Sequence, residues 1–179
     1  MVALPGFVSC AKKSTKLLWA LAWLQKFLGF TEVRRKEVFV IQLLLIVGSS
    51  IFVLLGAIHG VFTLQDLGNP RNFTPRDAGL RTAMQQSTIA LHPKINLWRA
   101  WLGFNFSHSL GLVMFGGAFL YVGIFHSLLF SQTPLLQGCS ISVPAAYVVI
   151  SLKFWFSKPA IYTGISMGCF ILAAALSYA

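Results

Sequence analysis

The chain has 179 residues, of which 56% are hydrophobic and only 10% are charged. A soluble domain carries about a quarter charged residues, so this composition excludes a soluble globular enzyme. The net charge of +10 does not indicate a nucleic-acid partner, because half of the 14 basic residues precede the first long apolar segment. Basic residues beside a membrane span are typical of topology signals and of contacts with anionic lipid headgroups.

The first predicted element is a short amphipathic helix over residues 17–30. It contains Gln25 and Lys26 and is too short to be a good membrane span, which favours a helix lying in the membrane interface. A signal peptide is the alternative, because basic residues precede the apolar part, but no small-residue cleavage site follows it. Residues 1–37 are therefore predicted to be a basic segment that contacts anionic lipid headgroups.

Four apolar segments then follow, and they predict a membrane domain over residues 38–179. A helix of about 20 residues crosses a hydrocarbon core of about 30 Å, and the predicted spans are 38–62, 97–130, 143–156 and 159–178. Pro144 is expected in the first turn of the third span, and residues 157–159 are expected to form a tight turn. The sequence thus predicts an all-α fold, a four-helix transmembrane bundle with an interfacial N-terminal helix.

The segment between the first two spans, residues 63–96, is the one sizeable aqueous loop. Thr74, Pro75 and Asp77 are typical of an N-cap, a proline at the first helical position and an acidic first turn. They predict a short surface helix over residues 75–88, which ends before the break at His92 and Pro93. His92 is expected to face water.

Orientation follows from the basic residues closest to the first span. Arg34, Arg35 and Lys36 directly precede it, whereas Arg71 is the nearest basic residue after it. Basic residues favour the cytoplasmic side, so both termini are predicted to be cytoplasmic. The protein is expected in the bacterial inner membrane or an equivalent internal membrane.

Polar residues inside a span are costly to bury without partners, and so they are candidates for a functional site. On the first helix His59 shares a face with Gly48, Phe52 and Gly56, and small residues mark the side where helices approach closely. On the second helix His108 shares a face with Asn105, one turn before it, and with Trp101, two turns before it.

The two histidines are expected at the same depth, because consecutive spans run antiparallel. Loop residues Asp66, Asp77 and Arg81 would lie above them. The candidate catalytic residues are therefore His59, His108, Asn105, Arg81 and Asp77. An interhelical hydrogen-bond network that merely fixes helix register is the structural alternative. His126 lies on the same face of the second helix, and no partner histidine is available at its depth.

Residues 98–111 read W-R-A-W-L-G-F-N-F-S-H-S-L-G, and R-T-A-M stands at 81–84. Together these blocks resemble a family of small uncharacterised bacterial four-helix membrane proteins. The resemblance implies the four-helix architecture over residues 38–178 but no activity. The family pattern includes Arg81, Met84, Trp98, Trp101, Asn105, His108 and Gly111.

Three functions remain open on the sequence. The first is a membrane-embedded enzyme for a lipophilic substrate, with His59 and His108 as acid and base because histidine titrates near neutrality. Asn105 would orient the substrate, and Arg81 or Asp77 would close the site. The second is an accessory or assembly subunit that binds other membrane subunits. The third is a protein that binds a single haem, a pigment or a metal ion through His59 and His108.

Overall fold

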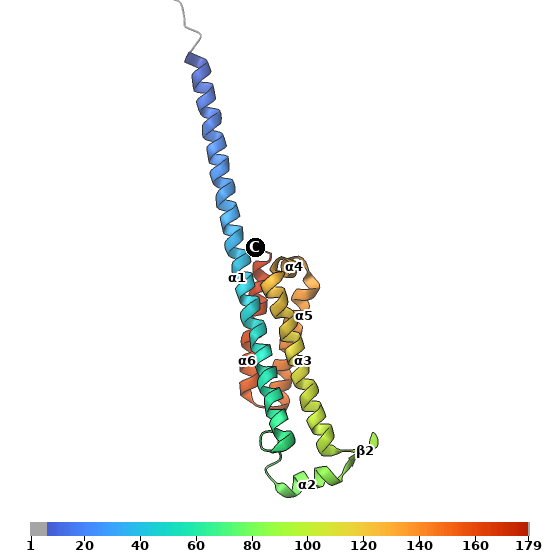
Figure 1. Cartoon of the computed structure of the whole chain (residues 1–179). Helices are drawn as coiled ribbons and strands as arrows, with labels where there is room; N and C mark the ends of the chain where they lie inside the picture. Colours follow the sequence, from blue (N-terminus) through green and yellow to red (C-terminus); the bar gives the residue numbers. More distant parts are fainter. Residues whose placement is uncertain (1–6, 179) are drawn as a thin grey trace, which may run out of the picture. The chain divides into compact units, whose positions relative to one another are not determined.

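The structure is a computed structural model that describes the backbone of residues 7–178 and the side chains of residue 32 and residues 34–178. The chain divides into two compact units, Met1–Val40 and Ile41–Ala179. Figure 1 labels the elements in chain order. All packing discussed below belongs to the second unit.

Helix α1 extends from Phe7 to Gly68, which corrects two predicted boundaries. Residues 17–30 and 38–62 lie in one helix, because the intervening residues contain no glycine or proline and Lys36 pairs with Glu32 one turn earlier at 3.1 Å. The predicted interfacial position of residues 17–30 falls outside the described side chains. The helix also continues past residue 62 and ends just before Asn69 and Pro70, since proline disfavours helical backbone in the residue before it.

The loop after α1 contains α2, Ala78–Gln86, and a two-stranded antiparallel hairpin. Its strands are β1, Thr88–Ile89, and β2, His92–Asn96. The predicted N-cap was wrong, because Asp77 occupies that position and accepts a hydrogen bond from the Gly79 N–H at 2.8 Å. The hairpin was not predicted, and exposed His92 begins its second strand.

The second predicted span is two helices, α3 over Leu97–Phe125 and α4 over Ser127–Gln132. A single helix over residues 97–130 would be about 50 Å long at 1.5 Å per residue, well beyond the hydrocarbon thickness. The chain leaves the helical path at His126, whose backbone φ is −139°. His126 is exposed, and its Nε2 atom lies 3.3 Å from the Tyr121 hydroxyl.

The last two spans are α5, Pro134–Phe154, and α6, Ser157–Leu176. Helix α5 begins nine residues before the predicted start, and Pro144 lies inside it. Hydropathy underestimated the length of this helix because its first turns contain polar residues. Their side chains bond to the helix's own backbone, as the Ser140 hydroxyl does when it donates to the Gln137 carbonyl at 2.8 Å. The turn falls at Trp155 and Phe156, so residues 157–159 belong to the first turn of α6.

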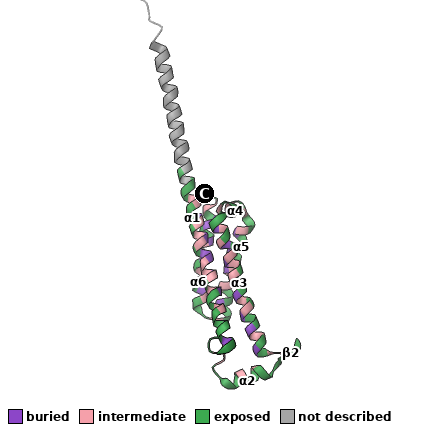
Figure 2. Cartoon of the chain, in the orientation of Figure 1, coloured by how far each residue is buried: buried purple, intermediate pink, exposed green. Residues whose placement is uncertain are grey.

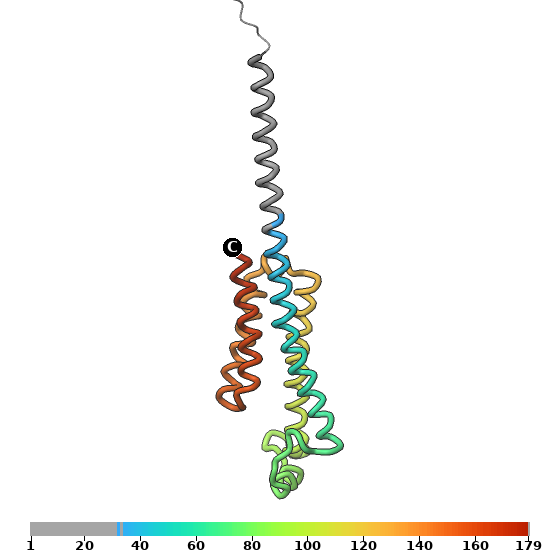
Figure 3. Tube along the Cα trace, turned by 90° about the vertical axis from the view of Figure 1, so that its left-hand side faces the viewer, coloured from blue at the N-terminus to red at the C-terminus, as the bar shows by residue number. Residues whose placement is uncertain are grey.

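Within the second unit, the membrane part of α1 packs against α3, and the α5–α6 hairpin lies beside this pair (Figures 1 and 3). Glycines allow the close approach of α1 and α3. A Cβ atom at Gly56 would lie 2.8 Å from the Leu112 Cβ, and one at Gly116 would lie 2.7 Å from the Val53 nitrogen. Helix α6 joins α1 through the Ser166 hydroxyl, which donates to the Gly48 carbonyl at 2.7 Å.

Large apolar side chains cover the outside of this bundle, and Figure 2 shows exposed residues along the outer faces of its helices. Such a surface would be unfavourable in water. Four helices in the described part of the chain are long and apolar enough to cross a membrane: Arg34–Gly68, Leu97–Phe125, Pro134–Phe154 and Ser157–Leu176. The protein is an all-α, multi-pass integral membrane protein, as the composition predicted.

Candidate functional site

His59 and His108 face each other between α1 and α3. Their ring centroids are 4.9 Å apart, with the planes at 63°. His59 shares its face of α1 with buried Phe52 and Gly56, as the periodicity predicted. We refer to His59 and His108 as the histidine pair.

Asn105 fixes the position of His59. The Asn105 Oδ1 atom lies 2.9 Å from the His59 Nε2 atom, and the Asn105 Nδ2 atom donates to the Trp101 carbonyl at 2.8 Å. Asn105 is fully buried, so these bonds satisfy an amide that would otherwise be costly to bury. Three of the five predicted site residues are therefore brought together.

Three further aromatic residues from other segments lie around the histidine pair, and no sequence pattern singled them out. Phe73 from the loop lies 4.3 Å from His59 by ring centroids, Trp155 from the α5–α6 turn lies 5.7 Å from His59, and Tyr147 of α5 lies 5.6 Å from His108. We call these three residues and the histidine pair the ring cluster. Aromatic residues are too frequent in this chain, at 14%, to single out any of them by type.

Several polar atoms of the ring cluster have no hydrogen-bond partner within residues 34–178. They are both ring nitrogens of His108, the Nδ1 atom of His59, the Tyr147 hydroxyl and the Trp155 indole nitrogen. The hydrogen bonds in this region all belong to other groups. Polar groups inside a membrane bundle are normally partnered. These atoms are therefore available to a bound molecule.

The two loop residues predicted to close the site lie elsewhere. Asp77 is exposed and caps α2. Arg81 is half-buried, and its Nε atom is buried without a hydrogen-bond partner in the described part of the chain. No hydrogen bond, ion pair or ring contact among residues 34–178 joins either residue to the histidine pair.

The acidic residue beside the site is Asp66 instead. Its carboxylate is fully buried and accepts hydrogen bonds from the backbone N–H groups of residues 71, 72 and 73 at 2.9, 2.9 and 2.6 Å. The loop therefore folds back onto the end of α1. The Phe73 carbonyl also accepts the Trp101 indole N–H at 3.0 Å.

The ring geometry does not suit a haem held between the histidine pair. Axial ligation by both histidines would place one nitrogen of each ring on opposite faces of a single iron, with the macrocycle in the space between the rings, whereas these two rings are in edge contact with centroids 4.9 Å apart. His59 Nε2 is also already bonded to Asn105. No group of three or more metal-ligating side chains occurs in the described part of the chain.

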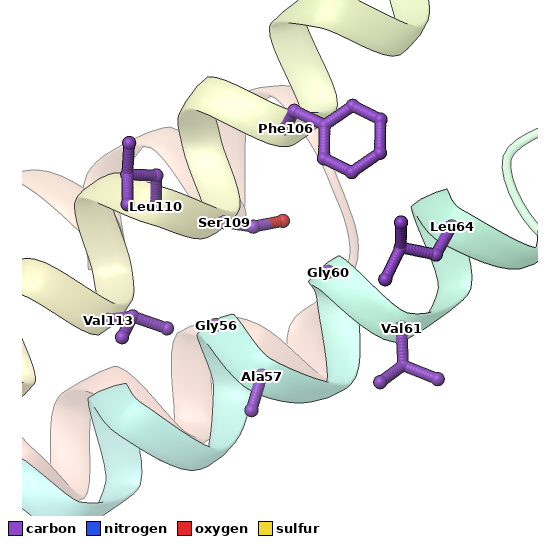
Figure 4. A pocket seen from close by; sticks show the side chains of 9 residues that line it. All are labelled: Gly56, Ala57, Gly60, Val61, Leu64, Phe106, Ser109, Leu110 and Val113. Atoms are coloured by element: carbon purple, nitrogen blue, oxygen red, sulfur yellow. The ribbon is translucent and has the colours of Figure 1, made fainter.

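A groove of about 320 Å³ lies between α1 and α3 (Figure 4), lined by sequence neighbours of His59 and His108 and not by the histidines themselves. Gly60 follows His59, and Ser109 donates to the Asn105 carbonyl at 2.8 Å. Ser109 is the one polar side chain among the lining residues, which are Gly56, Ala57, Gly60, Val61, Leu64, Phe106, Ser109, Leu110 and Val113. The groove therefore suits a hydrocarbon chain.

Comparisons with known proteins identify no relative: no family model, curated protein or solved structure matches this chain. The resemblance to small bacterial four-helix membrane proteins stays a prediction. The case for a function therefore depends on the site geometry.

Proposed function

We propose that this protein is a membrane-embedded enzyme that acts on a lipophilic substrate by proton transfer at the histidine pair. The observation that carries the proposal is the pairing of two histidines with different environments. His59 is held by Asn105, whereas His108, 4.9 Å away, has no hydrogen-bond partner in residues 34–178. A general acid or base needs a fixed position and a free nitrogen that can reach the substrate.

Each residue of the ring cluster has a role in this proposal. His108 exchanges a proton with the substrate, and the neighbouring His59, whose Nδ1 atom is not used by the bond to Asn105, acts as its counterpart. The Tyr147 hydroxyl and the Trp155 indole N–H donate hydrogen bonds to charge that develops on the substrate. The absence of a carboxylate in the ring cluster favours an isomerisation or another proton transfer.

The groove between α1 and α3 supports a lipophilic substrate. Its lining is apolar, and the Ser109 hydroxyl already has a partner in the Asn105 carbonyl. It lies along membrane-spanning helices, so a chain can enter it from the bilayer.

Chromatographic separation of lipids coupled to mass spectrometry tests the proposal, because an isomerisation changes the retention of a lipid and not its mass. Purified protein is reconstituted in vesicles of total bacterial lipid extract, and lipid species are compared before and after incubation. We expect one species to be converted by the wild type and by the His126→Ala control, which removes an exposed histidine, but not by His108→Ala. The proposal is overturned if the lipids are identical after incubation with wild-type protein and with a folded His108→Ala variant.

A further inference from the structure

Asp66 fastens the loop to the bundle. Besides the three backbone N–H groups of residues 71–73, its carboxylate accepts the Asn72 side-chain amide at 3.2 Å. Four donors on one fully buried carboxylate make a strong attachment, because hydrogen bonds to an ionised acceptor are stronger than neutral ones. We call residues 69–73 the strap.

The strap ends on the histidine pair. The Phe73 ring stacks on His59 with the planes at 32°, and the Phe73 carbonyl accepts the Trp101 indole N–H. The Trp101 carbonyl in turn accepts the Asn105 amide, which binds His59. The position of Phe73 is therefore coupled to His59 from two directions, by its ring and through this chain of hydrogen bonds.

We propose that Asp66 is a positioning residue, which holds the strap closed and so keeps Phe73 over the loop side of His59. Resting on the proposed function, the strap would shield the acid–base pair from water on the loop side while substrate enters from the bilayer. Asp66 itself does not touch the substrate. It acts through Phe73.

An amide cannot replace this carboxylate. One oxygen, Oδ1, accepts from residues 71 and 72, and the other, Oδ2, accepts from the Phe73 N–H. Asparagine has the same shape but only one acceptor oxygen, so its NH₂ group would face a donor. Asp66→Asn should therefore release the strap without creating a cavity or removing apolar packing.

The rate at which diethyl pyrocarbonate modifies each histidine, measured by peptide mass spectrometry, tests the proposal. In Asp66→Asn we expect His59 to react about tenfold faster than in the wild type, relative to exposed His92 and His126 of the same molecules. A tenfold change corresponds to about 1.4 kcal/mol. Asp77→Asn is the matched control, because Asp77 caps α2 outside this network.

Phe73→Ala is the second variant, for the case in which Asp66→Asn does not fold. It removes the ring from His59 and leaves the carboxylate intact, so His59 should again react faster. An unchanged His59 rate in either folded variant overturns the proposal. The rate of histidine modification does not depend on enzymatic activity. The proposal about the strap can therefore be contradicted while the proposed function holds, and the proposed function can be contradicted while the proposal about the strap holds.

Discussion

The hydrogen bond between His59 Nε2 and Asn105 Oδ1 fixes which ring nitrogen of His59 carries the proton. The Asn105 amide cannot be flipped, because its Nδ2 atom donates to the Trp101 carbonyl at 2.8 Å. Its Oδ1 atom must then accept from His59. A neutral His59 therefore carries its proton on Nε2, and its Nδ1 atom is the free acceptor.

Replacing Asn105 by leucine removes both of these bonds. Only the bond to His59 joins two helices, and hydrogen bonds of that kind contribute about 0.6 kcal/mol on average and up to about 1.7 kcal/mol, so Asn105→Leu should lower the free energy of unfolding by about 0.6–1.7 kcal/mol. Reversible unfolding in mixed detergent micelles measures this. Lipid conversion should be lost as well, because His59 is no longer held. A fully active Asn105→Leu variant would contradict the role of Asn105.

The close approach of α1 and α3 depends on Gly116. A Cβ atom there would lie 2.7 Å from the backbone nitrogen of Val53, which cannot move aside easily. Gly116→Ala should destabilise the bundle by about 1–3 kcal/mol, as overpacking usually does. Gly117→Ala is the control, because nothing lies within 4 Å of its Cβ position, and its midpoint of thermal unfolding should stay close to that of the wild type.

Filling the groove should weaken substrate binding without harming the fold. A Cβ atom at Gly60 meets only Ser109, at 3.6 Å or more, so Gly60→Leu fits while its side chain extends into the groove. We expect a raised KM in the lipid assay and unchanged thermal stability. Gly103→Leu, on the outer surface of α3 with no atom within 4 Å of its Cβ position, should leave KM unchanged.

The purified protein should be colourless. The histidine pair has no space for a macrocycle between its rings, so we expect no Soret band in the absorption spectrum. A Soret band that disappears in both His59→Ala and His108→Ala would contradict the enzyme proposal and favour a haem protein.

The strap and hairpin should face the outside of the cell. Leu91 is 92% exposed in the hairpin turn, so Leu91→Cys in a background without native cysteines should react with an impermeant thiol reagent on intact cells. This position is preferable to Asn72, whose side chain bonds to Asp66. Labelling only after the membrane is opened would invert the predicted orientation.

The class of protein and the number of spans follow from the sequence alone, and the helical period also predicted that His59 and His108 would lie close together. Hydropathy is summed over consecutive residues, so it predicts a span without information on which other helices pack beside it. The helical period places His59 and His108 on the faces of their helices that also carry buried residues. Helix ends were less predictable. Hydropathy marks where a helix becomes apolar, whereas local bonds, such as the Asp77 cap and those inside α5, decide where it begins.

The residues that surround the histidines become visible in the three-dimensional fold. Phe73, Tyr147 and Trp155 come from a loop, a third helix and a turn, and a helical period gives direction within one helix but not the identity of the segment opposite. The same limit applies to Asp66, which the sequence did not distinguish from the other charged residues of the loop. Asp66 is instead buried at the end of α1, where the chain folds back and supplies four hydrogen-bond donors to its carboxylate. These hydrogen bonds offset the free-energy cost of burying a carboxylate.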